Sequence, residues 1–459
     1  MALASKYSWA RKEDGWGILV NPKGRIFVVS SDLVGAIEGQ NLEEEAEDYL
    51  SHIGMLDKLP TCKIDFSRFE LQEINYPEDA TKLSAPIQVL VELTRKCNLN
   101  CPHCYVRGGK PRLNELQTHE WFTVLDEFKR MKIPFVSFTG GEPLLRDDIF
   151  KILNYADKLG FHFQISTNGL LLNEKNAEEI PPATHISISL DGWGKSNDFI
   201  RGEGSFKKIL TNIDILKRKG FEPTIYYTLM KTNLKDTAKF LRYCIRKKLL
   251  PAIFVVNEVG RCEDNKYLLL DENDVRSFFN ILRLYDTAYD LLEARSFLER
   301  FWQSLLHTRM LFPLVLRRHY KPKSRAQYGF YLSQFNGLVH HIFGGCRGAR
   351  CIAYVSSEGN VFPCSNCASY GIFGGGNVRL NSFEEIWKRA YVLEDFRKIL
   401  WGVFEGCKTC DISDVCTFRC AQRSMRRYGN PRICGATPFT MELFRQARKW
   451  NLTSQISPE

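Results

Sequence analysis

The sequence predicts an α/β protein built around a partial, TIM-like barrel of six β/α units, with a small domain before the barrel and a cysteine-rich domain after it. Three observations predict this fold. Short apolar runs alternate with amphipathic stretches between residues 86 and 260, which is typical of β/α units that share a parallel sheet. A hairpin pattern precedes this region. Most of the 15 cysteines lie either near its beginning or after its end.

Composition and pattern divide the chain into four segments. Residues 1–85 form a front domain and linker, 86–260 the barrel, 261–345 a helical, basic connector, and 346–459 the cysteine-rich domain with a C-terminal tail. With 459 residues, 44% of them hydrophobic, the chain can bury a large core. It has neither a membrane-spanning apolar run nor a signal sequence. We therefore expect a cytoplasmic protein, in which so many cysteines indicate metal binding rather than disulfides.

The front domain is expected to contain a β-hairpin and two short helices. Apolar residues 18–20 and 26–29 flank the turn residues 21–24, which include Pro and Gly. Ser31 is placed to cap the first helix and Asn41 to cap the second. A hairpin with a free edge can bind an extended peptide as an added strand.

The barrel is expected to alternate strands and helices. The strands lie near residues 87–94, 134–139, 163–167, 185–190, 222–229 and 252–257, and the main helices cover 119–131, 148–159, 204–219 and 235–247. Active sites of such barrels lie at the C-terminal ends of the strands. In the connector, helical periodicity continues from Asp271 to Met310.

Three cysteines directly follow the first barrel strand. Cys97, Cys101 and Cys104 are separated by gaps of three and two residues, so one loop can fold their thiolates around a single 4Fe–4S cluster. Three ligands leave one iron open for a substrate-like molecule. A zinc knuckle is the alternative, but zinc usually takes four ligands in a closed set. No fourth Cys or His follows at finger spacing, and His103 lies between two ligands.

Polar motifs end the next three strands, where they would meet at one end of the barrel. Each suits part of a charged ligand: a Glu accepts from an ammonium group, hydroxyl and amide groups suit a ribose, and an Arg fork suits a carboxylate. The candidate residues are Gly140, Gly141 and Glu142 after the second strand, Ser166 and Asn168 after the third, and Ser189, Asp191 and Arg201 after the fourth.

A second cysteine array occupies the C-terminal domain. Seven cysteines follow a fixed pattern with Gly359, namely Cys346, Cys364, Cys407, Cys410, Cys416, Cys420 and Cys434. Two clusters with full thiolate ligation need eight cysteines, and either Cys351 or Cys367 can supply the eighth. Two structural zinc sites are the alternative, because Cys-x2-Cys pairs suit zinc well.

The Cys97–Cys104 loop and the strand-end motifs together resemble the radical S-adenosylmethionine (radical SAM) superfamily. The resemblance implies that Cys97, Cys101 and Cys104 hold a catalytic 4Fe–4S cluster. At this cluster SAM is reductively cleaved to a 5′-deoxyadenosyl radical, which removes a hydrogen atom from the substrate. It also implies that the Gly140–Glu142 motif holds the SAM amino group, that the Ser166–Gly169 segment contacts the ribose, and that Ser189 and Arg201 hold the carboxylate.

The C-terminal array resembles the SPASM extension, an auxiliary-cluster domain of radical SAM peptide and protein maturases. By resemblance, the auxiliary cluster nearer the active site takes Cys346, Cys364, Cys420 and a fourth ligand. We prefer Cys351, because related enzymes place an extra cysteine shortly after the first, with Cys367 as the alternative. The second auxiliary cluster takes Cys407, Cys410, Cys416 and Cys434, which makes three clusters in all. Residues 377–400 match the helix between the two halves of such domains.

Two further comparisons bear on the substrate. Sulfatase-maturing relatives carry an Asp after the cysteine equivalent to Cys364, whereas this chain has Ser365, which argues against formylglycine formation. The front domain resembles the winged-helix-like, PqqD-like element that binds leader peptides, with pockets lined by Leu33, Ile37 or Leu50. A structural cap on the barrel is the alternative, and in the peptide-binding case we expect the front domain to be dispensable for cluster assembly.

These resemblances imply a radical SAM enzyme that modifies a ribosomally synthesised peptide or protein by a thioether or carbon–carbon crosslink or by epimerisation. A SPASM-type enzyme acting on a small molecule or porphyrin is one alternative, and a zinc-binding interaction protein is another. Eight Lys/Arg and one acid lie between Arg295 and Arg325, a segment suited to an electron donor such as flavodoxin or ferredoxin. We expect neither a nucleic-acid nor a membrane partner, because no basic stripe with stacking aromatics is found.

Overall fold

The computed structural model describes five main segments of the chain, with isolated positions after residue 405. These segments are 5–39, 41–57, 82–278, 346–398 and 420–430, and the short strand at 310–311 is also described. The predicted basic segment between Arg295 and Arg325 therefore lies almost wholly outside the described residues. So do two predicted ligands, Cys407 and Cys416.

The front domain is a three-stranded antiparallel sheet followed by two helices. Its strands are β1 (Trp9–Lys12), β2 (Trp16–Val20) and β3 (Ile26–Ser30), in that spatial order, and its helices are α1 (Ser31–Gly39) and α2 (Glu44–His52). The predicted hairpin is β2–β3, whereas β1 was not foreseen. The prediction that Asn41 caps the second helix is wrong, because α2 begins later with Glu43 at its N-cap.

The two faces of this sheet contact different partners, as the two-residue period of a strand requires. Side chains such as Ile18 and Val28 belong to the main hydrophobic core, which they share with the barrel. Their neighbours Leu19 and Val29 pack instead with the two helices. Leu33 and Leu50 lie in that second core, so the prediction that they line a peptide pocket is wrong.

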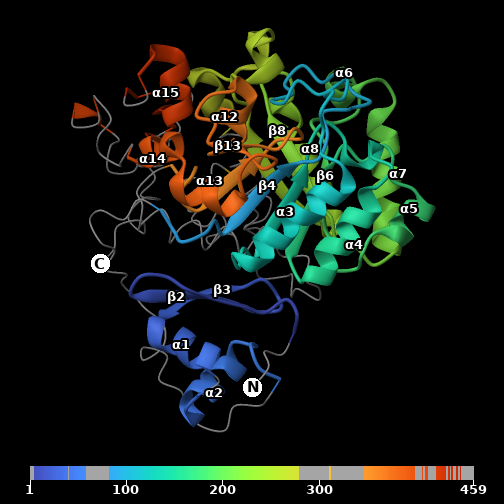
Figure 1. The fold of residues 1–459 in the computed structure, drawn as a ribbon. Coiled ribbons are helices and arrows are strands. Elements are labelled where there is room, and N and C mark those ends of the chain that lie inside the picture. Colours follow the sequence, from blue (N-terminus) through green and yellow to red (C-terminus); the bar gives the residue numbers. More distant parts are fainter. Residues whose placement is uncertain are drawn as a thin grey trace.

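The barrel contains the six predicted parallel strands in sequence order. They are β4 (Gln88–Glu92), β5 (Phe135–Thr139), β6 (His162–Thr167), β7 (His185–Ser189), β8 (Thr224–Leu229) and β9 (Leu250–Val255). The helices between them are α3 (Thr118–Arg130), α4 (Ile149–Leu159), α5 (Glu174–Glu179), α6 (Lys195–Arg201), α7 (Ser205–Arg218) and α8 (Thr237–Lys247). Their amphipathic faces cover the sheet, and the C-terminal ends of the strands lie at the top of Figure 1.

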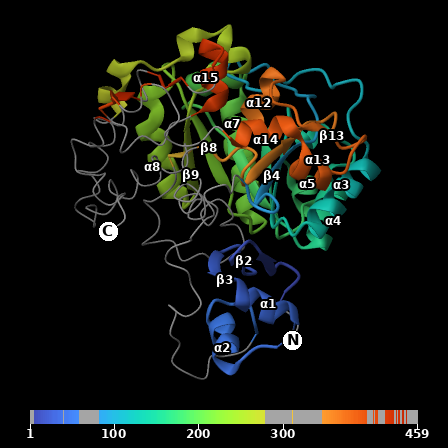
Figure 2. The ribbon, with the colours of Figure 1, turned by 60° about the vertical axis from the view of Figure 1, so that its left-hand side comes forward.

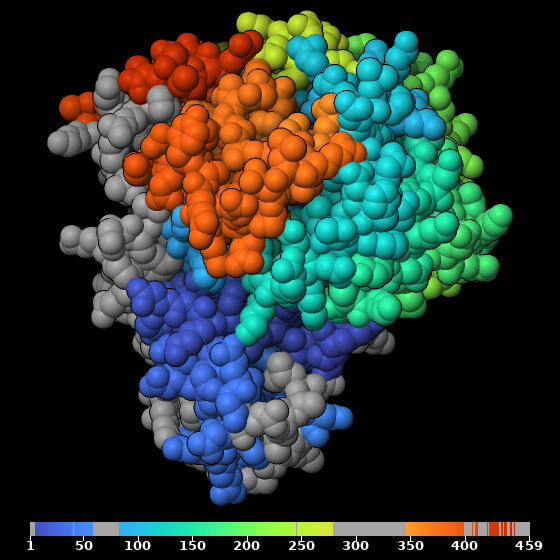
Figure 3. Space-filling model, in the orientation of Figure 1, coloured from blue at the N-terminus to red at the C-terminus, as the bar shows by residue number. Residues whose placement is uncertain are grey.

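The C-terminal domain extends the barrel sheet. Strand β11 (Ile352–Val355) pairs in parallel with β4, and β12 (Asn360–Phe362) and β13 (Gly376–Asn377) add antiparallel strands beyond it. The helices are α12 (Ser365–Tyr370), α13 (Phe383–Arg389), α14 (Tyr391–Arg397) and α15 (Ala421–Tyr428). Figure 3 shows residues 346–398, in orange, lying directly against the barrel.

Two predictions about helices are wrong. The expected single helix over residues 377–400 is two helices, α13 and α14, which are separated at Ala390 by an extended backbone conformation. Met310 was expected to end a long helix, but it belongs to β10 (Met310–Leu311), which pairs antiparallel with β9. Of the predicted connector helix, residues 272–278 are helical, and most of the remainder lies outside the described residues.

The front domain packs against the N-terminal ends of the barrel strands. Trp9 Nε1 donates to the Gly160 carbonyl at 3.0 Å, and Arg11 Nη1 donates to the Pro86 carbonyl at 2.9 Å. A Cβ at Gly160 would lie 2.0 Å from the Lys6 carbonyl oxygen. Figures 1 and 2 both show this domain at the end of the molecule opposite α15. Deleting the domain would therefore expose barrel core, so point variants test its role better than a truncation.

Among the described residues, no helix is long and apolar enough to cross a membrane.

Candidate active site

The Cys97–Cys104 loop follows β4 at the C-terminal end of the barrel strands. Backbone N–H groups point at two of its sulfur atoms: Leu99 N lies 3.4 Å from Cys97 Sγ, and Gly108 N lies 3.4 Å from Cys104 Sγ. Cys101 is 8% exposed. Donors directed at sulfur stabilise thiolate over thiol. This donor set fits a cluster bound by three thiolates.

Burial favours the protonated form of Cys97 and Cys101 if no cation is bound. Burial raises the pKa of Cys101 to about 11, although the Arg201 guanidinium opposes the shift. Burial also raises the pKa of Cys97, which the Leu99 N–H opposes. Thiolates in such a place need a nearby positive charge, and a metal cluster supplies it.

Arg261, which follows β9, holds the cysteine loop in place. Its Nε donates to the Cys101 carbonyl at 2.9 Å, its Nη1 to the Gly108 carbonyl at 2.8 Å, and its backbone N to the Cys104 carbonyl at 3.0 Å. The preceding Gly260 has φ +63°, and a Cβ there would lie 2.4 Å from the Cys104 carbonyl oxygen. Arg261 could not be found from the sequence, because about 160 residues separate it from its partners.

Replacing Arg261 by alanine is expected to destabilise the loop before any other part of the molecule. Anaerobically prepared Arg261→Ala protein is predicted to lose up to about four irons per chain, one cubane cluster, because the carbonyls of Cys101 and Gly108 lose their side-chain donors. Iron analysis checks this. Arg218→Ala, which removes an exposed ion pair with Glu174, is the control. Full iron retention in Arg261→Ala would show that the loop does not need this support.

The glycines of the Gly140–Glu142 motif allow β5 to approach the start of the cysteine loop. A Cβ at Gly140, where φ is +151°, would lie 2.3 Å from the Thr94 carbonyl oxygen, and one at Gly141 would lie 2.4 Å from that of Lys96. Gly141 N and Glu142 N also donate to these two carbonyls. The two glycines therefore fix the relative position of two parts of the site.

Glu142 connects the ends of β5 and β6. Its buried carboxylate accepts from Thr167 Oγ1 at 2.8 Å, Asn168 N at 2.7 Å and Leu144 N at 3.1 Å. Burial raises the pKa of Glu142, and these donors oppose the shift. A carboxylate has about four acceptor positions, so one remains for a ligand.

One of the two ribose candidates, Asn168, also contacts the cysteine loop. Asn168 Nδ2 donates to Asn98 Oδ1 at 2.8 Å, and Asn168 Oδ1 accepts from Leu170 N. Ser166 and Ser189 are both partly exposed. They lie in the neighbouring strands β6 and β7, at the same end of the sheet. The structure thus brings together candidates that lie far apart in the sequence.

Arg201 and Asp191 form a buried ion pair that also contacts the cysteine loop. Arg201 Nε lies 2.8 Å from Asp191 Oδ2, and His103 Nε2 lies 3.2 Å from the same oxygen. Burial by itself would raise the pKa of Asp191, but Arg201 and His103 hold it below its usual value. Part of the Arg201 fork expected for a ligand carboxylate is therefore bound to Asp191. His103, weighed only as a metal ligand, contacts this pair instead.

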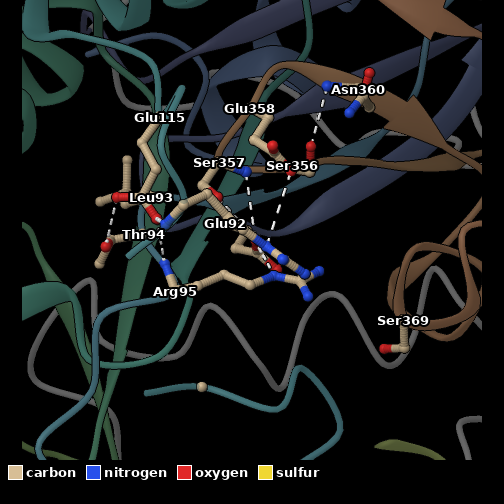
Figure 4. A network of polar contacts seen from close by, with 12 residues as sticks. Glu92, Leu93, Thr94, Arg95, Glu115, Ser356, Ser357, Glu358, Asn360 and Ser369 are labelled. Carbon is tan, nitrogen blue, oxygen red and sulfur yellow. Dashed lines mark hydrogen bonds and ion pairs between the residues drawn. The ribbon is translucent and has the colours of Figure 1, made fainter. Parts of the chain in front are cut away.

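A second buried carboxylate links the cysteine loop to the C-terminal domain (Figure 4). Glu92, at the end of β4, accepts from Arg95 Nε at 2.9 Å, Ser357 Oγ at 3.0 Å and Tyr354 Oη at 2.5 Å. Glu115 accepts from the backbone N of Arg95 at 2.7 Å. Arg95 precedes Cys97 by two residues, so the turn after β11 and the cysteine loop are held by one network. The sequence did not single out Glu92.

Of the described auxiliary cysteines, Cys364 and Cys367 lie next to each other at the start of α12. Cys364 Sγ and Cys367 Sγ are 3.6 Å apart. Cys410 and Cys434 are partly exposed. Cys244 and Cys262, interpreted as ordinary thiols, are fully buried, and burial raises the pKa of both, that of Cys262 to about 12. Within the described ranges, no three Cys, His, Asp or Glu side chains stand close enough to hold a single metal ion.

Comparison with protein families identifies the class of protein. Residues 91–244 match the model of the radical SAM superfamily, and residues 346–411 match that of SPASM, an iron–sulfur cluster-binding domain. The chain therefore contains a radical SAM domain and a SPASM domain, and it is an enzyme. Both matches coincide with the regions that carry the predicted motifs.

Individual relatives point to two kinds of substrate. The chain is 29% identical to an AdoMet-dependent heme synthase of Methanosarcina barkeri, over 72% of this chain and 90% of that protein. It is 28% identical to the mycofactocin maturase MftC of Mycobacterium ulcerans, over 74% of this chain and 84% of the relative. SuiB of Streptococcus suis, solved with S-adenosylmethionine, has a similar fold with a TM-score of 0.67 and 16% identity, covering 95% of this chain and 99% of SuiB. SuiB has also been solved with its precursor peptide SuiA.

Proposed function

We propose that this radical SAM enzyme modifies a ribosomally synthesised peptide or protein. The observation that carries the proposal is the front domain, which packs against the barrel and whose edge strand β3 has no further strand beside it among the described residues. The similarity in fold to SuiB over 95% of this chain, and the similarity in sequence to MftC, support a peptide substrate. A thioether, a carbon–carbon crosslink or an epimerised residue is the product class that we propose.

The proposed cofactors are SAM and three 4Fe–4S clusters. Cys97, Cys101 and Cys104 would hold the first cluster, which when reduced supplies the electron that cleaves SAM to a 5′-deoxyadenosyl radical. Glu142 offers one remaining acceptor position for the amino group. Ser189 and the remaining N–H groups of Arg201 are suited to the carboxylate, and Asp191 keeps Arg201 oriented.

The residues around the loop have positioning roles. Arg261 holds three loop carbonyls, and Asn98 and His103 connect the loop to the ends of β6 and β7 through Asn168 and Asp191. Because these contacts come from different strands, they fix the ligand-binding groups relative to the cysteines before SAM binds. Such preorganisation is what a reaction with a short-lived radical requires. Flavodoxin or ferredoxin remains the electron donor that we propose.

Strand β3 is one of the two edge strands of the front-domain sheet, and β1 is the other. Asn21 N donates to the Arg25 carbonyl, so these two residues form a hydrogen-bonded pair. In an antiparallel sheet every second residue pair is hydrogen-bonded, and the pairs between β2 and β3 alternate from this point. By this alternation, Ile26, Val28 and Ser30 direct their backbone N–H and C=O groups away from β2. Among the described residues, no other strand pairs with β3. An extended leader peptide could add there as a fourth strand.

Ile26→Pro tests this edge without removing a hydrogen bond between β2 and β3. Proline lacks the N–H that would pair with the leader, and the first residue of an edge strand tolerates it. We expect leader affinity to fall at least about tenfold, the equivalent of one good hydrogen bond. Fluorescence anisotropy with the leader of a precursor encoded beside the gene would measure this. Ile26→Ala, which keeps the N–H, is the control and should bind almost normally. If both variants bound the leader peptide equally well, the front domain would be a structural cap on the barrel and not a peptide-binding element.

A porphyrin or another small molecule is the second candidate substrate. The similarity to the heme synthase, which extends over 90% of that relative, favours it. The two candidates differ in a simple titration. If the protein binds a porphyrin, adding the protein shifts the visible absorbance of the porphyrin. If the protein binds only a leader peptide, the porphyrin spectrum stays unchanged. Micromolar porphyrin binding together with no peptide binding would replace the first candidate by the second.

A further inference from the structure

We propose that Glu92 is a positioning residue through which the C-terminal domain holds the Cys97–Cys104 loop in the geometry that binds SAM. The inference rests on the proposed cluster at Cys97, Cys101 and Cys104. It gives the C-terminal domain a role in SAM binding that is independent of the auxiliary clusters.

The carboxylate of Glu92 has no acceptor position left for a ligand. It is completely buried. Its Oε1 accepts from Arg95 Nε at 2.9 Å, from Ser357 Oγ at 3.0 Å and from Ser357 N at 3.4 Å, and its Oε2 accepts from Tyr354 Oη at 2.5 Å. A carboxylate has about four acceptor positions, and these donors fill them. Glu92 therefore differs from Glu142, which has one position left, and its role is to hold other residues in place.

The donors to Glu92 come from two different parts of the chain. Tyr354 belongs to β11 and Ser357 to the turn that follows it, so three of the four donors come from the C-terminal domain. The fourth is Arg95, at the start of the cysteine loop. A buried carboxylate that loses some of its donors is costly, so the carboxylate follows β11. The position of β11 thus decides where Glu92, and with it the Arg95 side chain, can lie.

Arg95 passes this position on to the first cluster ligand. Its backbone N donates to Glu115 Oε1 at 2.7 Å, and its carbonyl accepts from Gly109 N at 2.8 Å. The Gly109 carbonyl in turn accepts from Cys97 N at 2.8 Å. A displacement of Arg95 would therefore reach Cys97 through Gly109. The cluster ligand would then move relative to the strand ends that carry the SAM-binding candidates.

Tyr354→Phe and Tyr7→Phe form a matched pair of variants for the test. Both tyrosines are buried, and the hydroxyl of each donates to a carboxylate at 2.5 Å, that of Tyr7 to Asp157. Each substitution removes one oxygen atom and one charge-assisted hydrogen bond, so the direct effect on stability is similar in kind. The two differ in place, because Tyr7 lies in the front domain, at the opposite end of the barrel.

The measurements separate SAM binding from stability. Full-length protein would be prepared without oxygen and reconstituted with iron and sulfide. Calorimetric titration would measure SAM binding, and the reduced protein would be examined by electron paramagnetic resonance (EPR) with and without SAM. The difference between these two spectra reports the cluster that SAM contacts, and not the auxiliary clusters. Urea unfolding would measure the loss of stability in each variant.

We expect Tyr354→Phe to weaken SAM binding at least about fivefold, the equivalent of one ordinary hydrogen bond, and to change the SAM-dependent EPR difference. Tyr7→Phe should bind SAM as the wild type does, although both variants lose stability. Ser357→Ala removes a second donor from the same domain. It should resemble Tyr354→Phe, and it takes the place of that variant if Tyr354→Phe does not fold.

Two results would overturn the inference. One is wild-type SAM affinity and an unchanged EPR difference in Tyr354→Phe and Ser357→Ala. The other is equal weakening of SAM binding in Tyr354→Phe and Tyr7→Phe, because the cause would then be a general loss of stability. Wild-type protein whose EPR spectrum did not respond to SAM would instead contradict the proposed cluster itself.

Discussion

Replacing Cys97, Cys101 and Cys104 together by alanine is expected to abolish SAM cleavage and to lower the iron content from about twelve to about eight per chain. The three thiols are the protein ligands that we assign to the radical-forming cluster, and the auxiliary cysteines remain intact. Iron analysis and chromatographic measurement of 5′-deoxyadenosine under reducing conditions would check both parts.

Two other buried cysteines provide the control for this experiment. Cys244 and Cys262 are fully buried and have no assigned role, so their replacement by alanine should leave iron content and SAM cleavage unchanged. If the triple variant still made 5′-deoxyadenosine at the wild-type rate, the assignment of the cysteine loop would be wrong.

Arg201→Ala is expected to weaken SAM binding and also to destabilise the fold. The side chains of Arg201 and Asp191 are 8% and 1% exposed, so removing the cation leaves a buried carboxylate with only its other partners. Breaking a buried ion pair in this way costs about 3–5 kcal/mol of unfolding free energy. Urea unfolding at pH 8 and titration with SAM would measure the two effects.

The double variant Arg201→Ala/Asp191→Asn separates the two effects. It removes both charges, so it should recover a large part of the lost stability but not the SAM affinity. If the double variant were no more stable than Arg201→Ala, the ion pair would not be the cause of the destabilisation.

The pH dependence of the Arg201→Ala defect follows from the pKa of Asp191. In the wild type, Arg201 and His103 hold this pKa below its usual value. Ionised Asp191 therefore stabilises the fold above about pH 4, which is the pKa of an Asp in the unfolded chain. That stability is lost as the pH falls through the lower pKa of Asp191 in the folded protein. Without Arg201, burial raises the pKa of Asp191, and protonation of its carboxylate removes the cost of burying an unpaired charge. The loss of stability should thus become smaller as the pH is lowered from 8 toward the raised pKa of Asp191 in the variant.

The sequence predicted those parts of the site that are local in the chain. The cysteine loop, the motifs at the strand ends and the six parallel strands all follow from short-range spacing and periodicity. Arg261, Glu92 and the contact of His103 with Asp191 could not be predicted in this way. Each depends on which strand ends become neighbours after folding, and the residue types involved are common on ordinary surfaces.

The errors have similar physical causes. Residues 377–400 have the apolar pattern of one helix, but at Ala390 the backbone is extended and the helix breaks. The sequence predicts the front domain to be a separate module, because its apolar residues alternate as in any hairpin. The structure shows that one face of this hairpin shares the barrel core. Amphipathic pattern indicates that a face is buried, but not which partner covers it.

The origin of the hydrogen atom in 5′-deoxyadenosine tests the proposed function most directly. A precursor peptide encoded beside the gene would be made with deuterated residues and incubated with SAM and the reduced protein. Mass spectrometry of the 5′-deoxyadenosine would follow. We expect deuterium in the nucleoside, a matching mass change in the peptide, and neither in the Cys97/Cys101/Cys104 variant. Unlabelled 5′-deoxyadenosine with an unchanged peptide, and label acquired instead from a deuterated porphyrin, would contradict it.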